Sequence, residues 1–84
     1  MVYALLICRS LTYAQRTAAV LERSGISASV LRTPKRIAVT GCSYSVKISV
    51  SRREEVRDLL LRENLLPKSV VYARENGIYE EVPL

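Results

Sequence analysis

Hydrophobic and polar residues follow a strand-like, then a helix-like, then a strand-like pattern along the first third of the chain. Residues 2–8 form a nearly continuous apolar run rich in strand formers, as is typical of a central strand covered by helices. From Ala14 to Leu21 the apolar residues recur every three or four positions, which predicts an amphipathic helix. Gly25 can adopt the left-handed conformation that closes a helix. Alternation over residues 26–30 then predicts a half-exposed second strand.

The same order of patterns returns in the second half of the chain. Residues 44–50 show the cleanest alternation and predict a third strand with one wet face. A helical period runs over residues 54–63, and Asn64 is a candidate terminator. Residues 70–73 predict a fourth strand, and Asn76-Gly77 predicts a hairpin into a short fifth strand. The positions of the third strand that we expect to face water are Ser45, Lys47 and Ser49.

Each predicted helix is preceded by the spacing of a capping box. Thr12 and Gln15 have this spacing before the first helix, and Ser51 and Glu54 have it before the second. In such a box the hydroxyl and the side chain three residues later each satisfy an orphan backbone group. We therefore expect the helices to begin at Thr12 and Ser51.

Two strand-helix-strand units in tandem predict an α+β fold. We expect one domain over residues 1–84 with a ferredoxin-like βαββαβ sheet, both helices on one face, and a short C-terminal hairpin strand. The first and third strands would be antiparallel neighbours, so Cys8 would lie beside the start of the third strand. The terminal strand could pair within the chain or with a second copy, which makes a homo-oligomer through this edge one expectation.

Charge and composition limit the class of protein. The chain has 84 residues, 13 Lys and Arg against 8 Asp and Glu, and a net charge of +5, which favours acidic partners or is simply a basic soluble surface. The apolar start is too short to span a bilayer, and no cleavage-site pattern follows it, so we expect a cytoplasmic protein without a membrane partner. Nucleic acid is a less favoured partner, because Tyr3, Tyr44 and Tyr72 are scattered and form no ribonucleoprotein motif.

The chain contains two cysteines and no histidine. The absence of histidine excludes a Ser-His or Cys-His catalytic pair, and two cysteines alone do not make a structural zinc site. We therefore expect no metal and no cofactor, and a carrier or binding protein rather than a true enzyme. Without a secretion signal the two thiols should stay reduced rather than form a structural disulfide.

Cys42 is the residue on which the candidate site depends. It lies in the basic segment 32–43 and is either a small buried residue or a functional thiol. In the predicted fold it emerges near the first helix N-terminus, whose dipole can lower a thiol pKa. Cys8 ends an apolar run and should be packed, although a reversible Cys8–Cys42 disulfide is a minor hypothesis. The residues expected to line the site are Cys8, Arg9, Ser10, Thr12, Lys35, Arg36, Gly41 and Ser43.

Short motifs along nearly the whole chain, in this order and spacing, resemble a family of small bacterial proteins of unknown function described as selenium/sulfur carrier-like. The segments that carry the resemblance are the first strand into Ser10, Leu21–Ile26, Arg32–Ile37, Gly41-Cys42, Tyr44–Val50 and Gly77–Tyr79.

The resemblance implies that Cys42 accepts sulfur or selenium as a persulfide or selenosulfide and passes it to a partner protein. An alternative from another class is a non-enzymatic binding or regulatory module. Such a module would use the basic loop or the sheet face to hold a protein, an anion or RNA.

Overall fold

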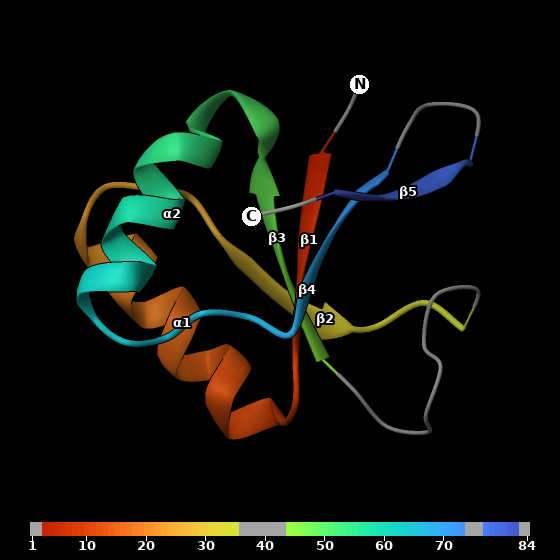
Figure 1. Ribbon diagram of the computed structural model, residues 1–84. Coiled ribbons are helices and arrows are strands. Elements are labelled where there is room, and N and C mark those ends of the chain that lie inside the picture. Colours follow the sequence, from red (N-terminus) through yellow and green to blue (C-terminus); the bar gives the residue numbers. More distant parts are fainter. Residues whose placement is uncertain (1–2, 36–43, 74–76, 83–84) are drawn as a thin grey trace.

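A computed structural model describes residues 3–35, 44–73 and 77–82. Its elements follow the predicted order of strands and helices (Figure 1). They are β1 (Tyr3–Cys8), α1 (Leu11–Arg23), β2 (Ser29–Arg32), β3 (Tyr44–Ser49), the short 3-10 helix η1 (Val50–Arg52), α2 (Arg53–Arg62), β4 (Ser69–Ala73) and β5 (Tyr79–Val82).

The strands form one five-stranded antiparallel sheet in the order β2-β3-β1-β4-β5. Both helices lie on the same side of this sheet (Figure 1). The α+β class and the antiparallel pairing of the first and third strands are thus confirmed. β5 pairs with β4 of its own chain, with Val70 opposite Val82, so the C-terminal hairpin strand is intramolecular.

β1 is buried on both faces, which explains its continuous apolar run. Ala4, Leu6 and Cys8 point toward the helices and join the main core, while Leu5 and Ile7 point to the opposite face and pack with Val71 in a second, smaller cluster. Burial of each leucine side chain is worth about 1.5–3 kcal/mol relative to exposure. The packing of both faces onto β1 therefore fixes its place in the middle of the sheet.

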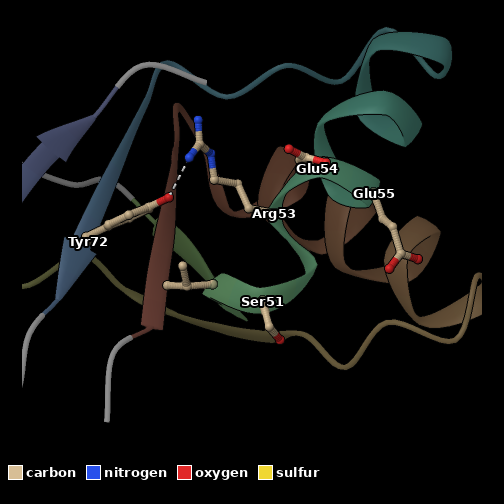
Figure 2. A pocket seen from close by; sticks show the side chains of 6 residues that line it. Ser51, Arg53, Glu54, Glu55 and Tyr72 are labelled. Carbon is tan, nitrogen blue, oxygen red and sulfur yellow. Dashed lines mark hydrogen bonds between the residues drawn. The ribbon is translucent and has the colours of Figure 1, made fainter.

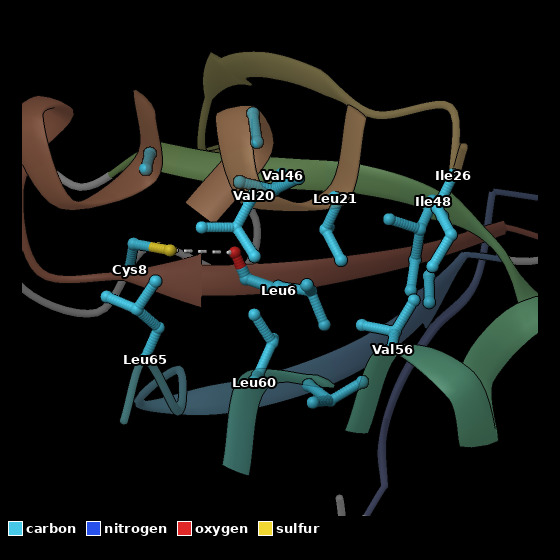
Figure 3. Packing of buried hydrophobic residues seen from close by; sticks show 14 residues of the cluster. Leu6, Cys8, Val20, Leu21, Ile26, Val46, Ile48, Val56, Leu60 and Leu65 are labelled. Carbon is cyan, nitrogen blue, oxygen red and sulfur yellow. Dashed lines mark hydrogen bonds between the residues drawn. The ribbon is translucent and has the colours of Figure 1, made fainter. Parts of the chain in front are cut away.

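The main core joins α1 and α2 to the strands beneath them (Figure 3). Leu21 of α1 and Leu60 of α2 are both fully buried in it. The residues of this cluster are Ala4, Leu6, Cys8, Ala14, Ala18, Val20, Leu21, Ile26, Val46, Ile48, Val56, Leu60, Leu65 and Val70.

The predicted capping residues of both helices were wrong, although α1 begins within one residue of its predicted start. Ser10 caps α1: its backbone is extended and its Oγ accepts a hydrogen bond from the Tyr13 amide at 3.1 Å. Thr12 already lies within the first helical turn. After β3 the chain forms the 3-10 helix η1, which Ser49 caps and which contains Ser51. The following helix, α2, begins at Arg53 and has no side-chain cap. The capping-box spacing could not reveal these local hydrogen bonds.

Both predicted helix stops are confirmed. Gly25 has a φ of 79°, and the Ile26 amide donates to the Leu21 carbonyl at 2.9 Å. Asn64 likewise has a φ of 58°, and the Leu65 amide donates to the Leu60 carbonyl at 2.9 Å. Two left-handed residues therefore close the two helices in the same way.

Two details of the predicted strands were wrong. β2 begins at Ser29, because Ile26 is drawn into the main core instead of joining the sheet. Ser45 was expected to face water, yet it is fully buried and hydrogen-bonded to Thr33. Lys47 and Ser49 are exposed as expected. The predicted Asn76-Gly77 turn includes Asn76, which lies outside the described residues.

Candidate functional site

One end of the sheet gathers segments that are far apart in the sequence. β1 and β2 end there, and β3 and β4 begin there. Tyr44 lies opposite Cys8 on one side and opposite Arg32 on the other, and the Lys68 amide donates to the Ile7 carbonyl at 2.8 Å. We call this end the rim and define it by Cys8, Arg9, Ser10, Tyr13, Arg32, Tyr44 and Lys68. The expected position of Cys8 beside the start of the third strand is confirmed.

The N-terminus of α1 belongs to the rim. Ser10 caps it, and the guanidinium carbon of Arg9 lies 5.8 Å from the centre of the Tyr13 ring. The Tyr13 hydroxyl donates to the Leu66 carbonyl at 2.8 Å, which ties α1 to the segment before β4. The positive end of the helix dipole and the Arg9 cation therefore share one place.

Cys8 is buried beneath the rim with 0% of its surface exposed. Its sulfur points into the core and donates to the Leu6 carbonyl at 3.5 Å (Figure 3). Desolvation by burial raises the pKa of Cys8 from 9.0 to about 11, and a hydrogen bond with Thr17 offsets part of this increase. At neutral pH Cys8 is therefore a protonated and inaccessible thiol, as the apolar run had suggested.

A buried hydrogen bond fixes the chain where it leaves β2 and where it enters β3. The hydroxyl groups of Thr33 and Ser45 lie 2.7 Å apart, and both residues are almost fully buried. A buried hydroxyl group without a hydrogen-bond partner destabilises the fold, and here each of the two hydroxyl groups is the partner of the other. This pair fixes the start of the basic segment, at Thr33, against β3.

The remaining residues of the predicted site divide into two groups. Arg9, Ser10, Thr12 and Lys35 are exposed, and the first three lie at or next to the α1 N-terminus. Thr12 does not cap the helix. Arg36, Gly41, Cys42 and Ser43 lie outside the described residues.

The three tyrosines considered for base stacking do not share a face of the sheet. Tyr44 and Tyr72 pack beside the main core on the helix side, whereas Tyr3 packs on the opposite side with Leu5 and Ile7. The Lys47 ammonium lies 4.4 Å from the Tyr3 ring centre. That opposite face is itself largely buried at Leu5, Ile7 and Val71. Among the described residues, the rings on that face are those of Tyr3 and Tyr79, and both are half-buried beside this cluster.

A hollow of about 290 Å³ lies at the other end of the sheet, where β3 passes into α2. Its lining residues are Val50, Ser51, Arg53, Glu54, Glu55 and Tyr72. Arg53 crosses it to donate to the Tyr72 hydroxyl at 3.0 Å (Figure 2). Glu55 pairs with Arg52 at 2.8 Å, and this pairing lowers the pKa of Glu55. No pattern in the sequence indicated this hollow, which is separate from the rim.

Sequence reasoning missed several rim residues. Tyr13, Arg32, Tyr44 and Lys68 were not assigned to the site, yet strand register brings the last three into line with Cys8. The available sequence clue was that Arg32 closely follows the predicted strand 26–30 and Lys68 closely precedes the predicted strand 70–73, and these strand ends meet at one end of the sheet.

Two further observations concern membranes and metals. No helix in the described ranges is both long and apolar enough to cross a membrane. Within residues 3–35, 44–73 and 77–82, no three Cys, Asp or Glu side chains cluster in a way that could hold a metal ion.

The chain was compared with known proteins and protein families. The model of the family described as "Putative Se/S carrier protein-like" matches residues 3–72. No curated protein and no solved structure matches the chain.

Proposed function

Because this chain belongs to the Se/S carrier protein-like family, we propose that it holds sulfur or selenium on Cys42 as a persulfide or selenosulfide and passes the atom to a partner protein. The match over residues 3–72 includes Cys42 as well as the rim. The proposal concerns a carrier and not an enzyme that makes or breaks carbon bonds.

The burial of Cys8 is the observation that carries the proposal. A thiol carrier needs an accessible sulfur that is partly thiolate near neutral pH. The chain has two cysteines, and Cys8 is fully buried with its pKa raised to about 11. If this chain carries sulfur on a thiol, Cys42 is therefore the residue that does so.

The surroundings of the rim support a reactive thiol near it. Only Ser43 separates Cys42 from Tyr44 in the sequence, and Tyr44 lies opposite Cys8, the last residue before Arg9 and the α1 cap. A helix N-terminus and nearby cations stabilise a thiolate and lower its pKa. In this proposal Arg9, Arg32 and the α1 N-terminus provide that positive field.

The proposed transfer needs no external oxidant. The Cys42 thiolate attacks the terminal sulfur of a persulfide on the donor protein, and a new S–S bond forms on Cys42. The donor's S–S bond breaks, and its electron pair leaves with the donor thiolate. The reverse step, with an acceptor thiolate as attacking group, unloads the carrier.

The test is intact-mass spectrometry after incubation with a cysteine desulfurase and cysteine. Wild type should gain the mass of one sulfur atom, which a reducing agent removes, and Cys42→Ser should gain none. Cys8→Ser is the matched control and should still load. A wild-type protein that gains no sulfur, or a Cys42→Ser variant that loads as well as wild type, would contradict the proposal.

The alternative of a binding module through the sheet face is less well supported. The apolar residues Leu5, Ile7 and Val71 on the face opposite the helices are buried, so they offer no exposed apolar patch for a partner. A version that uses the basic segment predicts binding that weakens steeply with salt and survives Cys42→Ser. The mass experiment therefore separates the two functions.

We also infer a ferredoxin-like βαββαβ arrangement for β1 to β4 and the two helices, with β5 as an addition at the edge. The central position of β1 and β3 and the placement of both helices on one face support it. A carrier needs a free thiol, and thiols stay reduced in a reducing compartment. We therefore propose that the protein acts in the cytoplasm.

A further inference from the structure

We propose that the rim is the surface on which an acidic face of the sulfur-donating protein docks. This inference rests on the proposed carrier function and adds to it the chemistry of the partner. It is carried by the described cations of the rim, by their fixed positions, and by the exposed apolar side chains beside them.

Exposed cations converge on the rim from separate segments of the chain. Arg9 follows β1, Arg32 ends β2, and Lys68 precedes β4. Lys35 follows β2 by three residues and is also exposed. Neighbouring strands lie about 4.8 Å apart, so the row from Arg32 through Tyr44 and Cys8 to Lys68 spans about 14 Å. A positive patch of this width matches a small protein contact.

Two of these cations are held in place by tyrosine rings. The guanidinium carbon of Arg9 lies 5.8 Å from the Tyr13 ring centre, and that of Arg32 lies 5.9 Å from the Tyr44 ring centre. Tyr13 is itself fixed by its hydrogen bond to the Leu66 carbonyl. An arginine that is already positioned loses less side-chain entropy when it meets a carboxylate.

The described carboxylates lie mostly away from the rim. Glu22 is near the end of α1, while Glu54, Glu55 and Asp58 occupy the first half of α2 at the opposite end of the sheet, among Arg52, Arg53 and Arg57. Glu63 lies at the end of α2 next to Arg62, and Glu80 and Glu81 lie on β5, opposite Tyr72 and Val71 of β4. None of the residues that define the rim is a carboxylate, whereas Glu54, Glu55 and Asp58 lie among the arginines of the far end.

Exposed leucines accompany the rim cations. Leu11, the first residue of α1, and Leu66, whose carbonyl accepts from Tyr13, are each 40% exposed. Protein interfaces combine apolar contacts with a charged or polar border. Nucleic acid would instead require free aromatic faces, but the rings of Tyr13 and Tyr44 are half-buried and covered by arginines. These features favour an acidic protein surface as the occupant.

The experiment measures sulfur transfer from a cysteine desulfurase to the carrier in the double variant R9E/K68E. The initial rate of adduct formation on Cys42 should fall at least about tenfold relative to wild type, since reversed charges oppose docking. The wild-type rate should also fall when salt rises from about 50 mM to about 300 mM, because salt screens exposed charges. R57E, an exposed change on α2 away from the rim, is the matched control and should transfer like wild type.

Alkylation by the neutral reagent iodoacetamide separates docking from thiol reactivity. Because Arg9 also contributes to the positive field proposed for Cys42, R9E/K68E should alkylate more slowly than wild type, and the loss of transfer should exceed this loss of reactivity by at least about tenfold. Transfer that is unchanged in R9E/K68E, or reduced equally in R57E, would overturn the docking surface while leaving the carrier function intact. If wild type takes up no sulfur at all, the carrier function itself fails. A labelled single-stranded RNA that binds wild type but not R9E/K68E, with transfer unaffected, would assign the rim to nucleic acid instead.

Discussion

The identification of Cys42 as the carrier depends on Cys8 being unreactive in the folded protein. The variant Cys42→Ser leaves Cys8 as the only thiol, since the chain has two cysteines. We expect this variant to resist alkylation at neutral pH for as long as it stays folded. The reason is that Cys8 is both uncharged and inaccessible.

The expected protection follows from the structure. Burial raises the pKa of Cys8 from 9.0 to about 11. At neutral pH an increase of two pKa units lowers the thiolate fraction about a hundredfold. Lack of access lowers the alkylation rate further. Cys8 is 0% exposed, so a reagent can reach it only when the core opens locally. Alkylation should therefore be at least about a hundred times slower than in the unfolded chain.

The assay is intact-mass spectrometry of Cys42→Ser after timed exposure to iodoacetamide, in buffer and in urea. Urea should restore the rate of a free thiol, which shows that the reagent and the residue are competent. The wild type should add one group rapidly in buffer. If Cys8 in the folded variant reacts within a few-fold of its rate in urea, both the burial argument and the exclusion of Cys8 as carrier are refuted.

Other predictions concern stability, measured by urea denaturation. Leu60→Ala should lower the free energy of unfolding by about 2–5 kcal/mol, because Leu60 is 0% exposed, whereas Leu61→Ala at 55% exposure should change it by less than about 0.5 kcal/mol; equal effects would contradict the packing. Ser10→Ala removes a helix cap and should lower the free energy of unfolding by about 1 kcal/mol. A larger decrease in Thr12→Ala would instead support Thr12 as the cap, as the capping-box spacing predicted. Because the folded pKa of Cys8 lies above its unfolded value, its contribution to stability is complete below about pH 9 and is lost as pH rises toward 11, for a total of about 2–3 kcal/mol. Cys8→Ser should lack this part of the decline, and identical pH curves for the two proteins would count against the shift.

Local pattern was enough to predict the order and type of the elements. The central strand has a continuous apolar run, the two helices have a helical period, and the hairpin strand follows a turn dipeptide. Each of these signals is local, so no long-range information was needed. Gly25 and Asn64 were also recognisable as helix ends, because few residues adopt positive φ readily.

Helix starts could not be predicted as well. Ser10, Thr12, Ser49 and Ser51 are all chemically able to cap, and the choice among them depends on how the chain leaves the preceding strand. The burial of Ser45 likewise depends on Thr33, twelve positions earlier, which the alternation within β3 cannot reveal.

At the candidate site, the residue pattern was enough to show that this small, histidine-free chain has two thiols and that one of them ends an apolar strand. It also supplied the resemblance that the family match over residues 3–72 confirms. Only the folded structure shows that Arg9, Arg32 and Lys68 converge on the rim above the buried Cys8. The physical reason is that antiparallel register brings strand ends together regardless of their separation along the chain, and that burial, not residue type, sets the pKa of a thiol.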